Sequence, residues 1–576
     1  MDLKEIRKER KLTQQQSADI LGISRRTYQT LEKEGKKENE TKYEYYCGVL
    51  SGQYQKKEVN QQTESFLTLV KTGKELETYK SNVRDYKKRN CYSFLKDYID
   101  NDYIGKVCIL YGLRRSGKTT MLFQLLNELD LSETVYIKID TKDTMGDLIK
   151  EINRLTEMGI KYFLIDEITL LDDFVNSASA LSDIYCQAGQ KIILSGTDSL
   201  GFDFAKRDEL YDRAIIIHTS YITFKEFSMV LGITDVDKYI EYGGTMQKEN
   251  MKFDDPERED LSLAFREDES TRKYIDSAIS QNIQRTLKNY SFGSNFYALR
   301  ELYDKGELTN VINRLVENMN HEFLLSVIEE RFKSHDFGSA RQILFKRPNK
   351  EVQTALSEVN EKEILERLKK IIYIKEKEET MVKVTQEAIN QIKGYLIALD
   401  LLKEIEVRYD DGTSEKISII TQPGMRYSIT KALCYSLFED PYFASISDSA
   451  QEEIIETIMS DVKGRMLEDI VLLESTYRKT KDEVVFKYKR KNSAGEIDMV
   501  KYDKANNCFR VYEIKHTEKM FPKAQCKYLN DDELIKSLTN KYGELATKYV
   551  LYRGNLSGVE DGVRYENVGT YLRSLR

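Results

Sequence analysis

Residues 106–120 read KVCILYGLRRSGKTT, and an apolar helical stretch, MLFQLLNEL, follows directly. The apolar run over 107–111 predicts a buried strand that leads into a glycine-containing loop and then into a helix. Gly112 and Gly117 permit backbone angles that turn successive N–H groups inward, so the loop and the helix N-terminus can form a cradle for phosphate. The spacing is that of GxxxxGK[ST], which predicts a nucleotide-binding loop.

The polar residues after Gly117 suit a nucleotide and its metal. Lys118 supplies a charge that reaches the outer phosphates, and the Thr119 hydroxyl can ligate Mg²⁺. We expect the adjacent Thr120, like Gly112 and Gly117, to bind the nucleotide. We therefore expect ATP and Mg²⁺ as cofactors.

A second apolar strand, KYFLIDEI (161–168), ends in an acidic pair. Acidic pairs usually decorate surfaces, whereas this one terminates a buried strand. We expect Asp166 to hold the Mg²⁺ ion and Glu167 to polarise the attacking water.

A third apolar strand, KIILSG (191–196), delivers Thr197 and Asp198. Related ATPases place a polar sensor of the γ-phosphate here, so Thr197 is a further candidate. Strands and helices alternate from Val107 to His218, which predicts a parallel sheet covered by helices with its ligand at the carboxyl ends of the strands.

Together with GTDSLGF (196–202), DRAIIIHTSYITFKEF (212–227) and YGGT (242–245), these motifs resemble prokaryotic AAA-superfamily ATPases that often carry a C-terminal nuclease-like domain. The resemblance spans most of residues 95–576. It implies that Arg213 senses nucleotide or acts across a subunit boundary in a homo-oligomer. A structural salt bridge is an equally good interpretation of this residue.

The N-terminal stretch LTQQQSADILGISRRTYQTLE (12–32) predicts two short helices joined by a tight turn. It resembles the helix-turn-helix DNA-binding domain of Cro and phage-repressor type regulators. The resemblance implies that Arg25, Arg26 and Thr30 contact base edges and that Gln14 contacts a phosphate. The alternative is a small helical module that docks on protein.

The C-terminal part presents four residues with metal-nuclease chemistry. Glu468 lies on an amphipathic helix, Asp498 on a strand, and Glu513 and Lys515 on one face of the next strand. The set resembles the PD-(D/E)XK nuclease core, which implies that Asp498 and Glu513 bind Mg²⁺, that Lys515 positions the attacking water and that Glu468 supports them. A cross-strand charge pair in an inactive scaffold is the alternative.

Composition bounds the class of protein. A chain of 576 residues exceeds one hydrophobic core, so several domains are expected. No apolar run reaches the length of a membrane span, and we expect a cytoplasmic protein with no membrane contact. The net charge is −7, but residues 4–37 hold ten Lys or Arg against five Asp or Glu, which favours DNA as a partner of that end. The seven cysteines show no zinc-site spacing.

The expected fold class is multidomain α/β. Its parts are an all-α helix-turn-helix domain (1–58), linker helices (59–95), an AAA-type ATPase domain with a parallel sheet (96–245), a helical lid and connector (246–380), a winged-helix-like domain (381–445) and a restriction-endonuclease-like α/β domain (446–576). The winged-helix-like segment, a helix followed by a strand pair with the turn DDGT, is expected to pack subunits.

The expected function is an ATP-hydrolysing, DNA-associated protein with a nuclease-like domain, in mobile-element control or phage defence. One alternative is a nucleotide-gated transcriptional regulator whose C-terminal domain only mediates assembly. Another is a STAND-like signalling ATPase that binds protein partners.

Overall fold

The computed structural model divides the chain into two compact units, residues 1–67 and 68–576. The structure describes residues 2–21, 25–34, 43, 46–47, 50–51, 66–197, 202, 210–246, 268–281, 283–284, 287, 297–333, 366–367, 369–370, 384–441, 443–445, 447–493, 495–520 and 525–575.

The first unit is a small helical domain. Helix α1 (Leu3–Glu9) begins with a capping box between Asp2 and Glu5, and α2 (Gln14–Leu21) and α3 (Arg25–Glu34) follow. Its apolar core is formed by Leu3, Ile6, Ala18, Leu21, Tyr28, Tyr43 and Leu50. The helices lie where the sequence predicts them, while the turn between α2 and α3, residues 22–24, lies outside the described residues.

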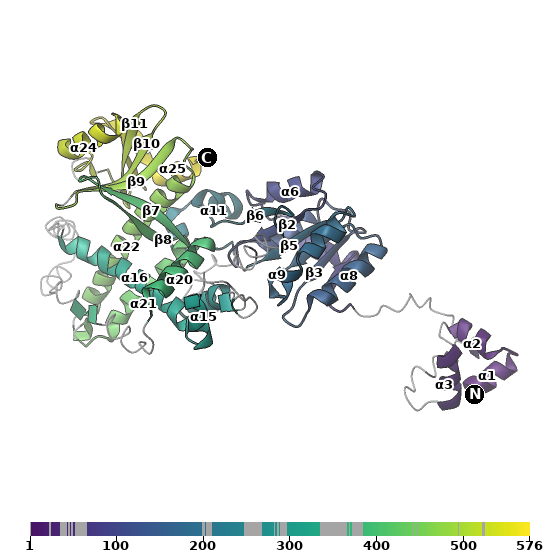
Figure 1. Cartoon of the computed structure of the whole chain (residues 1–576). Helices are drawn as coiled ribbons and strands as arrows, with labels where there is room; N and C mark the ends of the chain where they lie inside the picture. The colour runs from purple at the N-terminus through teal and green to yellow at the C-terminus, as the bar shows by residue number, and fades with distance from the viewer. Residues whose placement is uncertain are drawn as a thin grey trace. The chain divides into compact units, whose positions relative to one another are not determined.

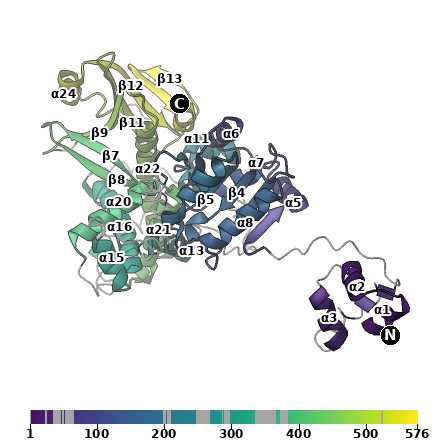
Figure 2. The same cartoon turned by 45° about the vertical axis from the view of Figure 1, so that its right-hand side comes forward.

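The second unit opens with a six-stranded sheet in the order β1-β3-β4-β5-β2-β6 (Figures 1 and 2). All neighbouring strands are parallel except β1, which runs antiparallel to β3. The bounds are β1 Leu69–Thr72, β2 Val107–Tyr111, β3 Thr134–Lys138, β4 Tyr162–Asp166, β5 Lys191–Gly196 and β6 Ala214–His218. The predicted parallel sheet is confirmed.

Helices cover this sheet because each presents an apolar stripe to it. In α8 (Met145–Glu157) the buried residues Met145, Leu148, Ile152 and Leu155 recur at helical spacing. The other helices are α5 Lys74–Asn82, α6 Tyr92–Asp100, α7 Lys118–Leu125 and α9 Phe174–Ser177. Strand β1 and α5 lie in the segment expected to be linker helices, but they join the six-stranded sheet and its core.

A helical region follows, and it includes helices on both sides of the segment 246–380 that the sequence predicts as a lid and connector. Its helices are α11 Phe224–Leu231, α12 Val236–Tyr242, α13 Asp268–Ile275, α15 Tyr297–Asp304, α16 Leu308–Lys333, α20 Gln386–Ala398 and α21 Pro423–Tyr435. An apolar cluster joins residues of α13, α15, α16, α20 and α21 into one core.

The C-terminal part is a mixed sheet of eight strands in the order β13-β14-β12-β11-β10-β9-β7-β8. The bounds are β7 Leu402–Tyr409, β8 Ser414–Ile420, β9 Glu483–Lys489, β10 Glu496–Asp503, β11 Cys508–Lys515, β12 Glu544–Tyr552, β13 Gly558–Glu560 and β14 Val563–Asn567. Strands β9, β10 and β11 form an antiparallel meander, and β12 pairs in parallel with β11.

The hairpin of β7 and β8 differs from the predicted separate winged-helix-like domain. Strand β7 pairs in parallel with β9, residues 407–409 against residues 487–489, so the hairpin extends the C-terminal sheet. Sequence reasoning missed this because parallel pairing between segments far apart in the chain leaves no local signal.

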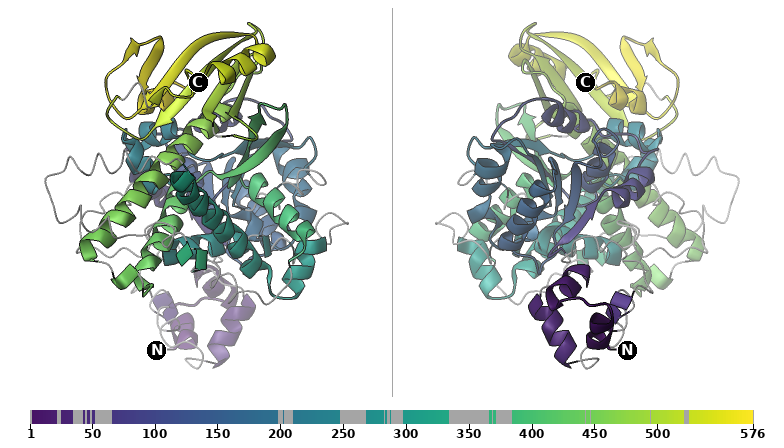
Figure 3. Two further views of the ribbon diagram at one scale, coloured as in Figure 1. Left: turned by 90° about the vertical axis from the view of Figure 1, so that its left-hand side faces the viewer. Right: turned by 90° about the vertical axis from the view of Figure 1, so that its right-hand side faces the viewer.

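Helix α22 (Asp448–Tyr477) connects the C-terminal sheet with the helical region (Figures 1 and 3). It packs against β9 and β11 of the C-terminal sheet and against α16 and α21 of the helical region. Helices α24 (Asp532–Tyr542) and α25 (Val568–Ser574) complete the domain. Among the described helices, none combines the length and apolar character needed to cross a membrane.

Candidate functional site

The phosphate loop lies at the carboxyl end of β2, between Tyr111 and α7. Gly112 has φ 149° and Gly117 has φ 87°, and both values favour glycine. A Cβ atom on Gly112 would lie 2.2 Å from the hydroxyl oxygen of Thr219, so the loop tolerates no side chain there. The backbone therefore takes the course that the sequence predicts for a phosphate cradle.

Lys118 folds back over this loop. Its Nζ donates to the carbonyl oxygens of Gly112 (2.9 Å) and Leu113 (3.0 Å), and the side chain is buried. Burial lowers the pKa of Lys118 to about 8, against the opposing charges of Glu167 and Asp166. The ammonium is thus held where phosphate oxygens would replace carbonyls as its partners.

Asp166, at the end of β4, faces the first turn of α7. Its Oδ2 accepts hydrogen bonds from Thr119 Oγ1 (2.8 Å) and Tyr136 Oη (2.9 Å), and its Oδ1 accepts one from Ser195 Oγ. A hydroxyl and a carboxylate oxygen placed together are the hard ligands that Mg²⁺ prefers. These residues therefore fit the predicted metal.

Tyr136 and Ser195 were not predicted as parts of this site. They come from β3 and β5, the two neighbours of β4 in the sheet, so their side chains can reach Asp166 from either side. The strand order, which would have indicated them, is not readable from a single sequence.

Glu167 and Thr197 also lie together. Thr197 Oγ1 donates to Glu167 Oε2 across 3.3 Å, and Glu167 has a left-handed backbone, φ 59°. Such a conformation in a non-glycine residue is rare and is found where a side chain must be aimed. Thr120 is half-buried on the first turn of α7, and Asp198 lies outside the described residues.

Arg213 lies just before β6, at the opposite end of the strands from the phosphate loop. Its carbonyl oxygen accepts a hydrogen bond from the amide of Val107, at the amino end of β2. Its Nε lies 2.8 Å from Asp183 Oδ1, and the side chain is 43% exposed. The structure brings Arg213 into a surface ion pair and not to the phosphate loop of its own chain.

In the first unit, Arg25 is exposed at the start of α3, and Thr30 is exposed on the same helix. Gln14 is engaged inside the unit, since its amide donates to Glu32 (2.6 Å) and its oxygen accepts from Gln29 (3.0 Å). The side chain of Arg26 lies outside what the structure describes. These contacts tie α2 to α3, as a helix-turn-helix requires.

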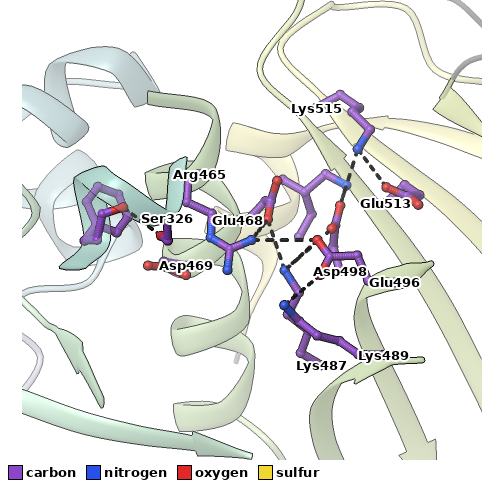
Figure 4. Close-up of polar contacts among 12 residues, drawn as sticks. Ser326, Arg465, Glu468, Asp469, Lys487, Lys489, Glu496, Asp498, Glu513 and Lys515 are labelled. Atoms are coloured by element: carbon purple, nitrogen blue, oxygen red, sulfur yellow. Dashed lines mark hydrogen bonds and ion pairs between the residues drawn. The ribbon is translucent and has the colours of Figure 1, made fainter. Parts of the chain in front are cut away.

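The four acidic and basic residues predicted in the C-terminal domain converge (Figure 4). Lys515 Nζ lies 2.8 Å from Glu513 Oε2 and 3.6 Å from Asp498 Oδ2. Asp498 is fixed by the amide of Ile514, which donates to its Oδ2 across 2.8 Å. Glu468 approaches from α22 and shares a cation, Lys487, with Asp498.

Two members of this cluster were missed by sequence reasoning. Glu496 stands two residues before Asp498 on β10, so strand alternation puts both on one face, and this signal was available. Carboxylate oxygens of Glu468, Glu496 and Asp498 all lie within 4.8 Å of one another. The other is Lys487 of β9, 3.1 Å from Glu496 and 3.3 Å from Glu468, and only the fold reveals it.

The cluster holds as many basic as acidic side chains. The cations are Arg465, Lys487, Lys489 and Lys515, and the carboxylates are Glu468, Glu496, Asp498 and Glu513. The oxygen ligands suit Mg²⁺, but the ammonium of Lys487 lies among them. The residues therefore fit a divalent cation only when Lys487 withdraws from the carboxylates.

The pKa values in the cluster diverge. Burial and the charge of Asp498 raise the pKa of Glu468 to about 7, and the same two causes raise that of Glu513 well above its usual range. Burial also raises the pKa of Asp498, but Lys515 and Lys487 outweigh it and hold that pKa below its usual value. Groups whose pKa values are pushed apart in this way are frequent at functional sites.

The sheet, the phosphate loop and the acidic strand end define an AAA-type P-loop ATPase domain. Residues 105–228 match a family model described as "AAA domain", which confirms that prediction. Such a domain implies binding of ATP, typically with Mg²⁺.

Two known proteins are similar to parts of the chain. An uncharacterized protein of Methanocaldococcus jannaschii is 27% identical over 127 residues, which are 21% of this chain and 28% of that protein. A structure of the Aeropyrum pernix Orc1 protein in complex with DNA aligns with 64% of this chain and 93% of its own, at 12% identity and a TM-score of 0.21. At that TM-score the two chains do not superpose as one fold.

Proposed function

We propose that the chain binds Mg²⁺–ATP at the phosphate loop and hydrolyses it. The observation that carries the proposal is the meeting of Lys118, Thr119 and Asp166 at the carboxyl edge of the sheet, with Lys118 folded onto the loop and Thr119 bonded to Asp166. When bound, Mg²⁺ neutralises phosphate charge; Thr119 and Asp166 would hold it.

Glu167 is the proposed residue that polarises the attacking water, and Thr197 orients its carboxylate through the 3.3 Å hydrogen bond. When ATP binds, Lys118 would exchange the loop carbonyls for the outer phosphates, where its positive charge stabilises the negative charge of the transition state. The test is ATP titration and phosphate release by the whole chain, with and without Mg²⁺. Tight, Mg²⁺-dependent binding followed by turnover is expected, and a chain that binds no ATP would overturn the proposal.

We propose that the first unit binds DNA, with Arg25, Arg26 and Thr30 at base edges. Support comes from the three-helix arrangement, the exposed Arg25 and the basic excess of this segment. The internal hydrogen bonds of Gln14 give it a second role, fixing α2 against α3. Retention of the chain on duplex DNA, weakened by salt, is the expected result.

A second candidate function is metal-dependent cleavage of DNA by the C-terminal cluster. The convergence of Glu468, Asp498, Glu513 and Lys515 favours it. Asp498 and Glu513 would hold the metal, which lowers the pKa of a bound water when present, and Lys515 would position that water. Glu496 extends the ligand set.

The proposed cellular role is ATP-dependent action on DNA in mobile-element control or phage defence, in the cytoplasm and as a homo-oligomer. Incubation with plasmid DNA across Mg²⁺, Mn²⁺ and nucleotide decides between the candidates. Nicked product supports the nuclease, whereas DNA retention without product supports a nucleotide-gated regulator with an inactive C-terminal scaffold. ATP binding with neither result supports the STAND-like signalling alternative.

A further inference from the structure

Three donors from outside the phosphate loop hold three successive carbonyl oxygens of its backbone. The donors belong to three separate segments: the loop before α6, the segment 243–246 that follows α12, and helix α13. The pairs are Arg89 Nη1 to Ser116 O (2.8 Å), Met246 N to Arg115 O (3.2 Å) and Tyr274 Oη to Arg114 O (3.1 Å).

This arrangement fixes the direction of the loop amides. In a trans peptide the carbonyl of one residue and the N–H of the next point in opposite directions. Because Arg89 holds the Ser116 carbonyl from outside the loop, the amide of Gly117 is turned to the other side, where phosphate binds. Tyr274 does the same for the amide of Arg115 by holding the Arg114 carbonyl. A cradle of N–H groups needs such orientation before the anion arrives.

Arg89 is itself rigidly held. Its guanidinium makes two hydrogen bonds to Glu226, at 2.6 and 3.0 Å, and the residue is 6% exposed. Glu226 also accepts from the amide of Asn90 at 2.9 Å. A paired, buried guanidinium has one orientation, so Nη1 stays on the Ser116 carbonyl, and Nη2 also donates to the Ser220 carbonyl (3.3 Å).

Tyr274 is held from the other side. Gln422 Nε2, just before α21, donates to the Tyr274 hydroxyl across 2.9 Å, which leaves the hydroxyl proton for the Arg114 carbonyl. The side chain of Leu113, in the same loop, packs in the apolar core of the helical region beside Tyr274. The loop is thus supported by a region that the GxxxxGK[ST] motif does not include.

We propose that Arg89 and Tyr274 are positioning residues for nucleotide phosphate, which they serve by orienting the amides of Gly117 and Arg115. The inference rests on the proposed binding of ATP. It predicts that the affinity for ATP depends on two side chains that do not touch the nucleotide.

The experiment compares three variants of the full chain. Tyr274→Phe removes one hydroxyl, and Arg89→Lys keeps the charge but loses the planar fork. Tyr98→Phe is the matched control, since Tyr98 is a buried tyrosine whose hydroxyl donates to the Lys106 carbonyl (2.8 Å) just before β2, at the opposite end of that strand from the phosphate loop. Thermal unfolding and ATP titration are measured for each variant.

The expected result is a Kd for ATP raised about 10-fold in Tyr274→Phe and in Arg89→Lys, because a tenfold change in Kd corresponds to about 1.4 kcal/mol, the size of the net contribution of one hydrogen bond. Tyr98→Phe should lose comparable stability and keep the parental Kd. Parental affinity in a folded Tyr274→Phe variant would overturn the inference, and this arm remains decisive where Arg89→Lys does not fold. A parent that binds no ATP would refute the proposed function instead, which separates the two failures.

Discussion

Thr119 Oγ1 donates a 2.8 Å hydrogen bond to Asp166 Oδ2, which joins the first turn of α7 to the end of β4. These are the two residues proposed to hold Mg²⁺, and in the described structure each already orients the other. The pair would give the proposed metal site a fixed geometry before the nucleotide binds.

The first prediction concerns this pair. Thr119→Ala should weaken ATP binding in the presence of Mg²⁺ by about 10-fold, because a metal ligand and a charge-assisted hydrogen bond are lost. Binding measured with EDTA should change little. Thr78→Ala, at an exposed position of α5, is the control. Equal losses with and without Mg²⁺ would argue against a metal role for Thr119.

The second prediction concerns DNA. Replacing Arg25 or Arg26 with Ala should cost about 1 to 3 kcal/mol of binding free energy on the preferred sequence, because each can contact a guanine edge. Lys305→Ala removes the same charge from an exposed position in the other unit and serves as control. Unchanged retention of the double Arg variant on DNA would assign the first unit to protein docking.

The third prediction concerns the C-terminal cluster. Asp498→Asn and Lys515→Ala should each abolish cleavage and leave ATP turnover intact, since neither residue lies at the phosphate loop. Asp503→Asn, at the half-buried last residue of β10, should cleave normally. Because Lys487 lies among the carboxylates, Lys487→Met should raise the affinity for Mn²⁺, measured by calorimetry. If the parent protein never nicks DNA, the nuclease role is contradicted and the cluster is a set of structural ion pairs.

The fourth prediction concerns pH and stability. Burial raises the pKa of Glu474 to about 8, although its carboxylate accepts hydrogen bonds from the amide of Phe224 and from Tyr239. Between these two pKa values the folded chain keeps a proton that the unfolded chain releases. The free energy of unfolding therefore falls as the pH rises from about 4.5 to about 8, by at most about 1.4 kcal/mol for each pH unit.

Glu474→Gln removes this titration and keeps an oxygen that can accept from Phe224. The variant should unfold at a higher temperature than the parent at pH 8, with the difference shrinking toward pH 5. Thermal unfolding across that range measures it. A pH dependence equal to the parent's would show that Glu474 does not titrate there.

The sequence predicted the parts of the fold that short-range patterns encode. Gly112, Lys118 and Asp166 stand in local motifs, and the alternation of strands and helices around them required a parallel sheet. The pairing of β7 with β9 and the contact of Tyr136 with Asp166 depend on strand order, which a single sequence does not contain. The supports of the phosphate loop were equally invisible, since Arg89 and Tyr274 lie in segments without a motif.

Arg213 shows a different limit. The resemblance to AAA-superfamily ATPases implied a nucleotide sensor or a contact across a subunit boundary, and the residue pairs with Asp183 at the amino edge of the sheet. Arg213 lies beside the amino end of β2, whereas the phosphate loop follows the carboxyl end of that strand. The side chain would therefore have to span the length of β2 to act in the site of its own chain. The trans role remains a proposal whose test is ATP turnover by mixtures of Arg213→Ala and Lys118→Ala chains.

The most direct test of the central claim is titration of ATP against Lys118→Ala and Glu167→Gln in the presence of Mg²⁺. Lys118→Ala should abolish tight binding, because it removes the buried ammonium that the loop holds for the phosphates. Glu167→Gln should bind like the parent and fail to release phosphate. A Lys118→Ala variant that binds ATP with parental affinity would contradict the account of the site.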